Sequence, residues 1–183
     1  MNSIQIEHAL ERLIKPRFAN FLGVFSHDLI PPLHSITSFP ACFVANTDDS
    51  NAPGEHWLAF YYENANHLEF FDSFAFPIEL YNINLTPTIS NTRRIQSYTS
   101  TVCGQYCIYF LYQRSLALSF YHIILSFHSF DFNWNDHQVA HFVKNHFSFS
   151  NAVLNNRSLL SICKICQTCK CASHSIFCTM PFH

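Results

Sequence analysis

An abrupt change from polar to apolar residues at Cys103 constrains this chain more than any other feature of its sequence. Residues 96–102 are mostly polar and hydroxylated, whereas residues 108–112 form an apolar and aromatic run that is typical of a buried helix. Cys103 is therefore predicted to lie where a loop meets a helix N-terminus. A thiol in that position feels the positive end of the helix dipole and nearby free N–H groups, which favour the nucleophilic thiolate. Gly104 leaves room beside it for a substrate backbone, and Gln96 can direct an amide N–H at a developing oxyanion.

A thiolate nucleophile needs a base, and residues 54–73 supply a candidate for it. Two aromatic and aliphatic runs flank an Asn-Ala-Asn break at 64–66, which predicts a β-hairpin with a short loop. If the loop is centred on Asn64, position 56 pairs with position 72, and directly opposed side chains share one sheet face about 5 Å apart. His56 and Asp72 are then neighbours at the open end of the hairpin. That arrangement suits a general-base imidazole whose other ring nitrogen is held by a carboxylate.

These motifs together resemble those of a known protease family. Gly-x-His-Trp, an apolar strand, Phe-Asp-Ser, and Gln followed by Cys-Gly-x-Tyr-Cys are similar to the adenain-type cysteine endopeptidases. That family comprises the adenovirus maturation protease and its relatives in large DNA transposons, which are distant cousins of the SUMO-specific, Ulp-type proteases. The resemblance covers residues 21–147, and the order of the motifs along the chain agrees with it. It implies that His56 is the base, Asp72 its acidic partner, Cys103 the nucleophile and Gln96 the oxyanion-hole amide. One departure is that the acidic partner is Asp, as in the SUMO proteases, where the adenovirus enzyme has Glu.

The resemblance also implies a fold and a reaction. The fold is expected to be α+β, of the papain-like and adenain-like type, with a mixed central sheet flanked by helices. The expected reaction is peptide-bond hydrolysis through a thioester, next to small residues such as glycine, in a viral or transposon precursor protein, with no cofactor. The resemblance suggests that Trp57 lines the substrate channel, although a core aromatic residue on a buried strand is the alternative. Gly54 and Gly104 are the other candidates for substrate binding.

Three other functions remain open on the sequence alone. The chain can remove a ubiquitin-like modifier, in which case a diglycine-ended modifier forms an adduct with Cys103. It can be a catalytically inactive relic that only binds partner proteins, for which His56 turned away from Cys103 is the distinguishing sign. A third possibility is a nucleic-acid binder with a zinc-binding tail.

The composition limits these choices. A chain of 183 residues fits one protease domain, predicted at 1–150, and a Cys-rich tail at 151–183. With 49% hydrophobic and 12% charged residues it can bury a sizeable core. Its 10 basic and 12 acidic side chains offer no electrostatic support for a nucleic-acid groove or an anionic membrane surface, although a nucleic-acid partner is not excluded. The chain shows neither a signal peptide nor an apolar run long enough to span a membrane, which predicts an intracellular protein, nuclear or cytoplasmic, with reduced cysteines.

The tail holds five of the eight cysteines. Weak candidates for zinc ligands are Cys163, Cys166, Cys169 and Cys171, with His174 nearby. The long spacer that usually separates two ligand pairs is missing, which favours a weakly structured extension over a zinc site.

Apolar spacing predicts helices at residues 2–14, with a capping pair at Asn2 and Gln5, and at 135–147. Residues 39–45 are predicted to form a short strand at a sheet edge, because they include a proline. Residues 74–92 have no sustained period and are expected to connect elements across the domain surface.

For several other side chains the sequence favours an interpretation that involves no functional site. Arg93 and Arg94 are interpreted as a solvated pair rather than a carboxylate site. His137 and His141 lie one helical turn apart but lack a third ligand, which favours exposed histidines over a metal site. Cys107 is expected to pack in the core.

Overall fold

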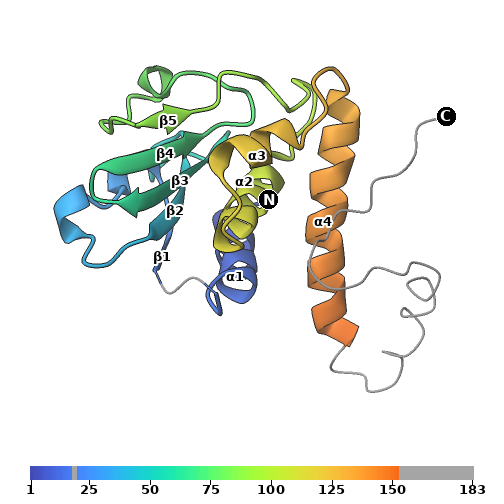
Figure 1. Cartoon of the computed structure of the whole chain (residues 1–183), viewed down its shortest axis with the longest axis horizontal. Coiled ribbons are helices and arrows are strands. Elements are labelled where there is room, and N and C mark those ends of the chain that lie inside the picture. The colour runs from blue at the N-terminus through green and yellow to red at the C-terminus, as the bar shows by residue number, and fades with distance from the viewer. Residues whose placement is uncertain (18–19, 153–183) are drawn as a thin grey trace. The chain divides into compact units, whose positions relative to one another are not determined.

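The computed structural model describes residues 1–17 and 20–152, and a mixed five-stranded sheet lies at the centre of this part of the chain (Figure 1). Its strands are β1 (Phe21–Phe25), β2 (Ala41–Asn46), β3 (Trp57–Asn64), β4 (His67–Phe71) and β5 (Ile89–Ser90), in that spatial order. The two outer pairs, β1 with β2 and β4 with β5, are parallel, whereas β2, β3 and β4 run antiparallel to one another. The predicted α+β class with a mixed central sheet is confirmed.

The α-helices of the described residues lie on one side of this sheet (Figure 1). They are α1 (Ser3–Leu13), α2 (Cys103–Ser115), α3 (Phe120–Leu125) and α4 (Phe132–Ala152). The opposite face is covered by loops that contain the short 3₁₀ turns η1 (His27–Leu29), η2 (Leu33–Ser35) and η3 (Ile78–Tyr81). Because both faces are covered, β2 is buried at every position and β4 at all but its first, which explains their nearly continuous apolar sequences.

Helix α1 begins where the sequence predicts it. The side chain of Asn2 accepts a hydrogen bond of 2.9 Å from the backbone N–H of Gln5, and the Gln5 side chain accepts one of 3.1 Å from the N–H of Asn2. This reciprocal pair satisfies two of the N–H groups that a helix start leaves free. The buried residues Ile6 and Leu10 then anchor α1 against α2 and the sheet.

The strand predicted at residues 39–45 is present as β2, but its predicted edge position is wrong. Strand β2 lies between β1 and β3, because residues 21–25 form a further strand that pairs with it. Pro40 does not prevent this, since it precedes the first residue of β2 and removes no ladder donor from it.

The hairpin of β3 and β4 is confirmed, although its register differs from the predicted one. Ala59 pairs with Phe71 and Tyr62 with Leu68, and a bulge lies between Tyr62 and Asn64. Continued to the open end, this register sets position 56 opposite Phe74 rather than opposite position 72. The shift is two residues, and an even shift leaves every side chain on its original face of the sheet. His56 and Asp72 therefore remain neighbours, as a diagonal pair.

Helix α4 contains the predicted helix at 135–147, and His137 and His141 are exposed on it as expected. No helix among residues 1–17 and 20–152 is long and apolar enough to cross a membrane. The predictions made for the Cys-rich tail, including its zinc ligands, fall on residues 153–183 and lie outside the described residues.

Candidate active site

The candidate site lies where the open end of the β3–β4 hairpin meets the N-terminus of α2. His56 immediately precedes β3, and Asp72 immediately follows β4. The Nε2 atom of His56 lies 2.7 Å from Oδ1 of Asp72. Both residues are buried, Asp72 completely. The structure thus brings the predicted base and its predicted carboxylate partner into a short hydrogen bond.

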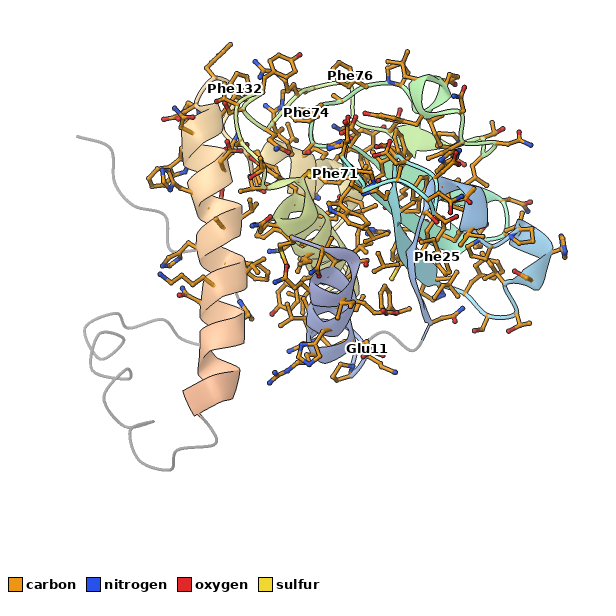
Figure 2. The ribbon with its side chains drawn as sticks, turned by 180° about the vertical axis from the view of Figure 1, so that it is seen from behind. Glu11, Phe25, Phe71, Phe74, Phe76 and Phe132 are labelled. Atoms are coloured by element: carbon orange, nitrogen blue, oxygen red, sulfur yellow. The ribbon has the colours of Figure 1, made fainter. Side chains whose placement is uncertain are left out.

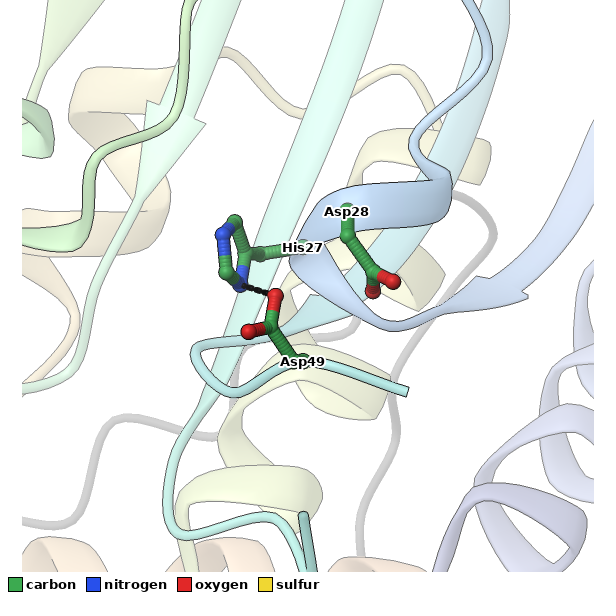
Figure 3. Close-up of side chains that lie close together, drawn as sticks. All are labelled: His27, Asp28 and Asp49. Carbon is green, nitrogen blue, oxygen red and sulfur yellow. Dashed lines mark ion pairs between the residues drawn. The ribbon is translucent and has the colours of Figure 1, made fainter. Parts of the chain in front are cut away.

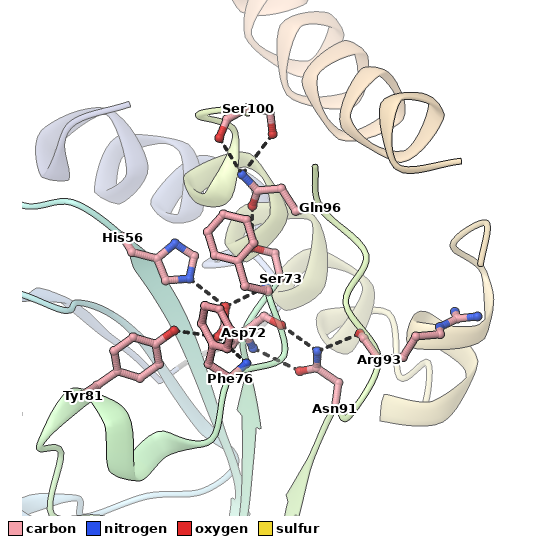
Figure 4. Close-up of polar contacts among 10 residues, drawn as sticks. His56, Asp72, Ser73, Phe76, Tyr81, Asn91, Arg93, Gln96 and Ser100 are labelled. Carbon is pink, nitrogen blue, oxygen red and sulfur yellow. Dashed lines mark hydrogen bonds and ion pairs between the residues drawn. The ribbon is translucent and has the colours of Figure 1, made fainter. Parts of the chain in front are cut away.

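Asp72 is held by more groups than His56 alone (Figure 4). Its Oδ1 also accepts the backbone N–H of Phe74 at 2.9 Å. Its Oδ2 accepts the backbone N–H of Phe76 at 2.9 Å and the hydroxyl of Tyr81 at 2.7 Å. Burying a carboxylate is costly unless donors surround it. Here the tight turn after β4 and the turn η3 supply those donors, and together they fix the oxygen that faces His56.

Cys103 is the first residue of α2, as predicted from the change in composition at this position. It is buried, and the imidazole of His56 acts on its thiol through hydrogen bonding and charge, both of which lower the pKa of the thiol. Since Nε2 of His56 is bound to Asp72, Nδ1 is the ring nitrogen that remains for the sulfur. Backbone hydrogen bonding from Trp57 and Gly104 also lowers the pKa of the thiol. The three predicted triad members therefore interact in the order Cys103, His56, Asp72.

The charges of this site favour a thiolate and imidazolium pair. Burial raises the pKa of the Cys103 thiol, but the hydrogen bond and charge of His56 outweigh it and hold that pKa below its usual value. Burial likewise disfavours the charged form of His56, yet its hydrogen bonds to Asp72 and Cys103 raise the pKa of His56 to about 9. A proton therefore rests more readily on the imidazole than on the sulfur near neutral pH.

Gln96 lies in the loop before α2 and is completely buried. Its Oε1 accepts the Ser73 hydroxyl at 2.5 Å, and its Nε2 lies 3.1 Å from both the carbonyl oxygen and the hydroxyl of Ser100 (Figure 4). Backbone bonds from Ile95 and Gln96 to the carbonyl of Ser73 strengthen the link. Ser73 follows Asp72 directly, so this loop is tied to the same turn that carries the acid. The oxyanion role of Gln96 stays a prediction.

The predicted substrate-binding residues are placed as follows. Trp57 is half-buried, and its Nε1 donates to the carbonyl oxygen of Met1 at 3.1 Å. A Cβ atom on Gly104 would lie 2.9 Å from Cδ1 of Ile6 and 3.4 Å from Cδ1 of Trp57, so the missing side chain permits close packing with α1. Gly54 has φ of +81°, and a Cβ there would meet the Asn46 side chain at 2.7 Å. Close packing therefore explains why residue 104 is glycine, and a positive φ with close packing explains the glycine at residue 54. Contact of either glycine with substrate stays a prediction.

Two residues of the site were missed by the sequence reasoning. Tyr81 binds the Asp72 carboxylate, and Asn91 binds its backbone, accepting from the N–H at 3.1 Å and donating to the carbonyl at 2.6 Å. Both come from the segment 74–92, which was expected to be a surface connection because its apolar residues show no regular helix or strand spacing. Asn91 is buried. The usable signal in the sequence is the asparagine at position 82, since asparagine is common in tight turns, and the structure places Asn82 in the left-handed region directly after η3 and Tyr81.

The interpretation of Arg93 and Arg94 as a solvated pair is wrong. Arg93 donates to the hydroxyl of Ser129 at 2.6 Å and to the carbonyl of Phe127 at 3.2 Å. The guanidinium of Arg94 lies 3.9 Å from the ring centroids of both Tyr98 and Phe132. Both arginines are half-buried, because Ser129 and Phe127 cover Arg93 and the rings of Tyr98 and Phe132 cover Arg94. Cys107, by contrast, is fully buried in the core as expected, and burial raises the pKa of its thiol far above the usual value.

A second group of titratable side chains, His27, Asp28 and Asp49, lies near the surface (Figure 3). Nδ1 of His27 is 3.4 Å from Oδ1 of Asp49. The Asp28 carboxylate accepts the backbone N–H of Ser50 at 2.9 Å and its hydroxyl at 2.8 Å. These contacts tie the loop before β3 to η1, which accounts for the group as a structural clasp.

Comparisons with known proteins add little to this geometry. No protein-family model and no curated protein matches the chain. Among solved structures, the fold is similar to a crystal structure of the selenomethionine ASFV pS273R protease, at a TM-score of 0.46 and 19% sequence identity. The similarity covers 76% of this chain, which spans 66% of the length of that protease. At these values no residue role is carried over from it.

Proposed function

We propose that this chain is a cysteine peptidase that acts on a protein or peptide substrate. The observation that carries the proposal is the short hydrogen bond between His56 and Asp72, together with the lowered pKa that His56 gives to the Cys103 thiol at the N-terminus of a helix. Peptide hydrolysis needs an activated nucleophile, a base that can return a proton, and a group that orients the base. These three groups have the required types and contacts.

In the proposed mechanism, the Cys103 thiolate attacks the scissile carbonyl and forms a tetrahedral intermediate. Its oxyanion is stabilised by the backbone N–H of Cys103 and by the Gln96 amide. Both oxygen acceptors of that amide belong to Ser100, so one of its N–H groups can serve both and leave the other for the oxyanion. The His56 imidazolium then protonates the leaving amine, and a thioester with Cys103 remains. Water, deprotonated by His56, hydrolyses the thioester, while Asp72 keeps the imidazole in position.

The finer assignment is an endopeptidase similar to the adenain and SUMO-protease families, which cuts next to small residues such as glycine in a precursor protein. The support is the order and types of His56, Asp72, Gln96 and Cys103, together with the close packing of Trp57 and Gly104 beside the thiol. The inactive-relic alternative expects His56 turned away from Cys103, and the contact between the two weighs against it.

The test is covalent labelling with a glycine-rich peptide that carries a thiol-reactive group, followed by mass mapping of the modified cysteine. We expect one adduct on Cys103 that is absent in Cys103→Ala and slowed at least about a hundredfold in His56→Ala. The control is His67→Ala, since His67 lies at the far end of the same hairpin and should not alter the labelling. Equal labelling of several cysteines, indifferent to His56→Ala, would contradict the proposal.

A further inference from the structure

A series of aromatic rings runs outward from the catalytic imidazole. The ring of Phe74 stacks on that of His56, with centroids 4.7 Å apart. Tyr98 stacks on Phe74 at 5.6 Å, and Phe76 lies 6.0 Å from Phe74 and 6.5 Å from Tyr98. The turn after β4 and the loop before α2 thus join their aromatic side chains directly beside the base.

Arg94 extends the series and holds it in place. Its guanidinium lies between the rings of Tyr98 and Phe132, and it donates to the carbonyl of Gln96 at 3.1 Å. Figure 2 shows Phe74, Phe76 and Phe132 along one edge of the domain. Together these residues form an aromatic surface that consists of Phe74, Phe76, Tyr98, Arg94 and Phe132. Beyond it lies an open cavity of about 420 Å³, lined by Ser97, His128, Phe130, Asp131, Phe132 and Asn133.

Two rings of this surface are exposed to water although the chain has a large core. Tyr98 is 63% exposed and Phe76 is 38% exposed. Exposed rings that adjoin one another are uncommon on a folded domain and mark places where another molecule binds. Because one end of the surface is stacked on His56, a molecule bound to it also reaches the site of the reaction.

The chemistry of the base decides which part of a substrate passes over this surface. His56 gives its proton to the leaving amine, so the residues on the C-terminal side of the cut bond lie on the His56 side of the thiol. We propose that the aromatic surface binds this leaving-side segment of the peptide and prefers a large apolar or aromatic side chain in it. The inference rests on the proposed peptidase function and adds a specificity determinant to it.

The experiment compares three peptides with the same glycine-containing acyl side and with Phe, Ala or Lys as the second residue after the cut. We expect the Phe peptide to have a kcat/KM about tenfold or more above that of the Ala peptide, as for a large apolar group entering a hydrophobic site. Tyr98→Ala and, separately, Phe76→Ala should bring this ratio close to one. The matched control is Tyr121→Ala, because Tyr121 is 62% exposed on α3 and its ring contacts Phe120.

Equal rates for the Phe and Ala peptides overturn this inference, as does a ratio that both Tyr98→Ala and Phe76→Ala leave intact. A preference for Lys also overturns it, and indicates that the Asp131 carboxylate in the neighbouring cavity governs specificity instead. If the protein cleaves none of the three peptides, the proposed function itself is overturned. Cleavage without preference leaves that function standing.

Discussion

Two buried pairs of an acid and a base have their carboxylates only three positions apart in the chain, and they have different properties. Glu69 in β4 pairs with Arg114 of α2, with Oε2 and Nε 2.8 Å apart. Asp72, just after β4, pairs with His56 at 2.7 Å. Both carboxylates are almost completely inaccessible, at 3% and 0% exposure. Burial alone therefore does not separate a structural pair from the pair proposed to be catalytic.

The donors around each carboxylate make the difference. Asp72 accepts two backbone N–H groups and the Tyr81 hydroxyl in addition to His56. Glu69 has Arg114 as its close ionic partner, with His67 at 3.9 Å, and burial outweighs that charge and raises the pKa of Glu69 to about 7. Arginine also holds its proton at every physiological pH, whereas histidine can take one up and release it. An immobilised acid with an exchangeable base supports chemistry, and a fixed cation supports packing.

The largest difference between the two pairs is expected in the rate of peptide cleavage when each carboxylate is replaced by its amide. Asp72→Asn removes the acceptor that orients His56 and favours the wrong imidazole tautomer, and we expect kcat/KM for peptide cleavage to fall about 10³- to 10⁴-fold. Glu69→Gln should leave the rate within about twofold of the wild type, because the ionic partners of Glu69, Arg114 and His67, lie outside the site. Comparable losses in the two variants would refute the division into catalytic and structural pairs.

Removing Arg114, the partner of Glu69, should lower the stability of the fold rather than the rate of cleavage. Arg114→Met leaves Glu69 buried without its cation, and we expect the free energy of unfolding in urea to drop by about 3–5 kcal/mol. Replacing both residues, as in Arg114→Met with Glu69→Leu, should recover much of the loss because no unpaired charge is left. A double variant as unstable as Arg114→Met would mean that packing of the guanidinium on Tyr61, 4.1 Å away, accounts for the effect.

Tyr81 tests whether the extra donors on Asp72 matter to the base. Tyr81→Phe deletes a hydrogen bond to a charged group but keeps the ring near His56, and we expect kcat/KM to fall about tenfold. With one donor fewer, Asp72 should attract the imidazolium more strongly, so the alkaline limb of the pH profile should move upward from about 9. Tyr62→Phe, a loss of a buried hydroxyl elsewhere in the hairpin, is the control. An unmoved alkaline limb would show that Tyr81 contributes to folding alone.

How much of this could be predicted from the sequence depends on how local each signal is. The loop-to-helix junction at Cys103 and the capping box of α1 are local patterns, and both predictions are confirmed. The sequence predicted that His56 and Asp72 are neighbours although the predicted register differs by two residues. The prediction survives because an even shift keeps both side chains on the same face of the sheet.

Contacts formed by tertiary packing were not predictable in the same way. Arg94 packs between Tyr98, four residues away, and Phe132, which lies on α4. Tyr81 reaches Asp72 only because the turn after β4 doubles back on itself. No periodicity marks such residues, since a single bend of the chain rather than a repeating face sets their partners.

The smallest expected effect concerns the pH dependence of stability. The pKa of Glu69 is raised from 4.5 to about 7, so between these values the folded state binds a proton that the unfolded state has lost. Stability from this group is therefore fully present below pH 4.5 and decreases as the pH rises through 7. The raised pKa of His56 also lowers stability as the pH rises, from 6.5 to about 9, but this contribution is common to the wild type and Glu69→Gln. From about pH 5 to 7, we expect urea unfolding to show the wild type losing on the order of 1 kcal/mol relative to Glu69→Gln. Parallel curves for the two proteins would mean that Arg114 keeps Glu69 charged throughout this range, and that the donors around each carboxylate, not a raised pKa of Glu69, distinguish the two buried pairs.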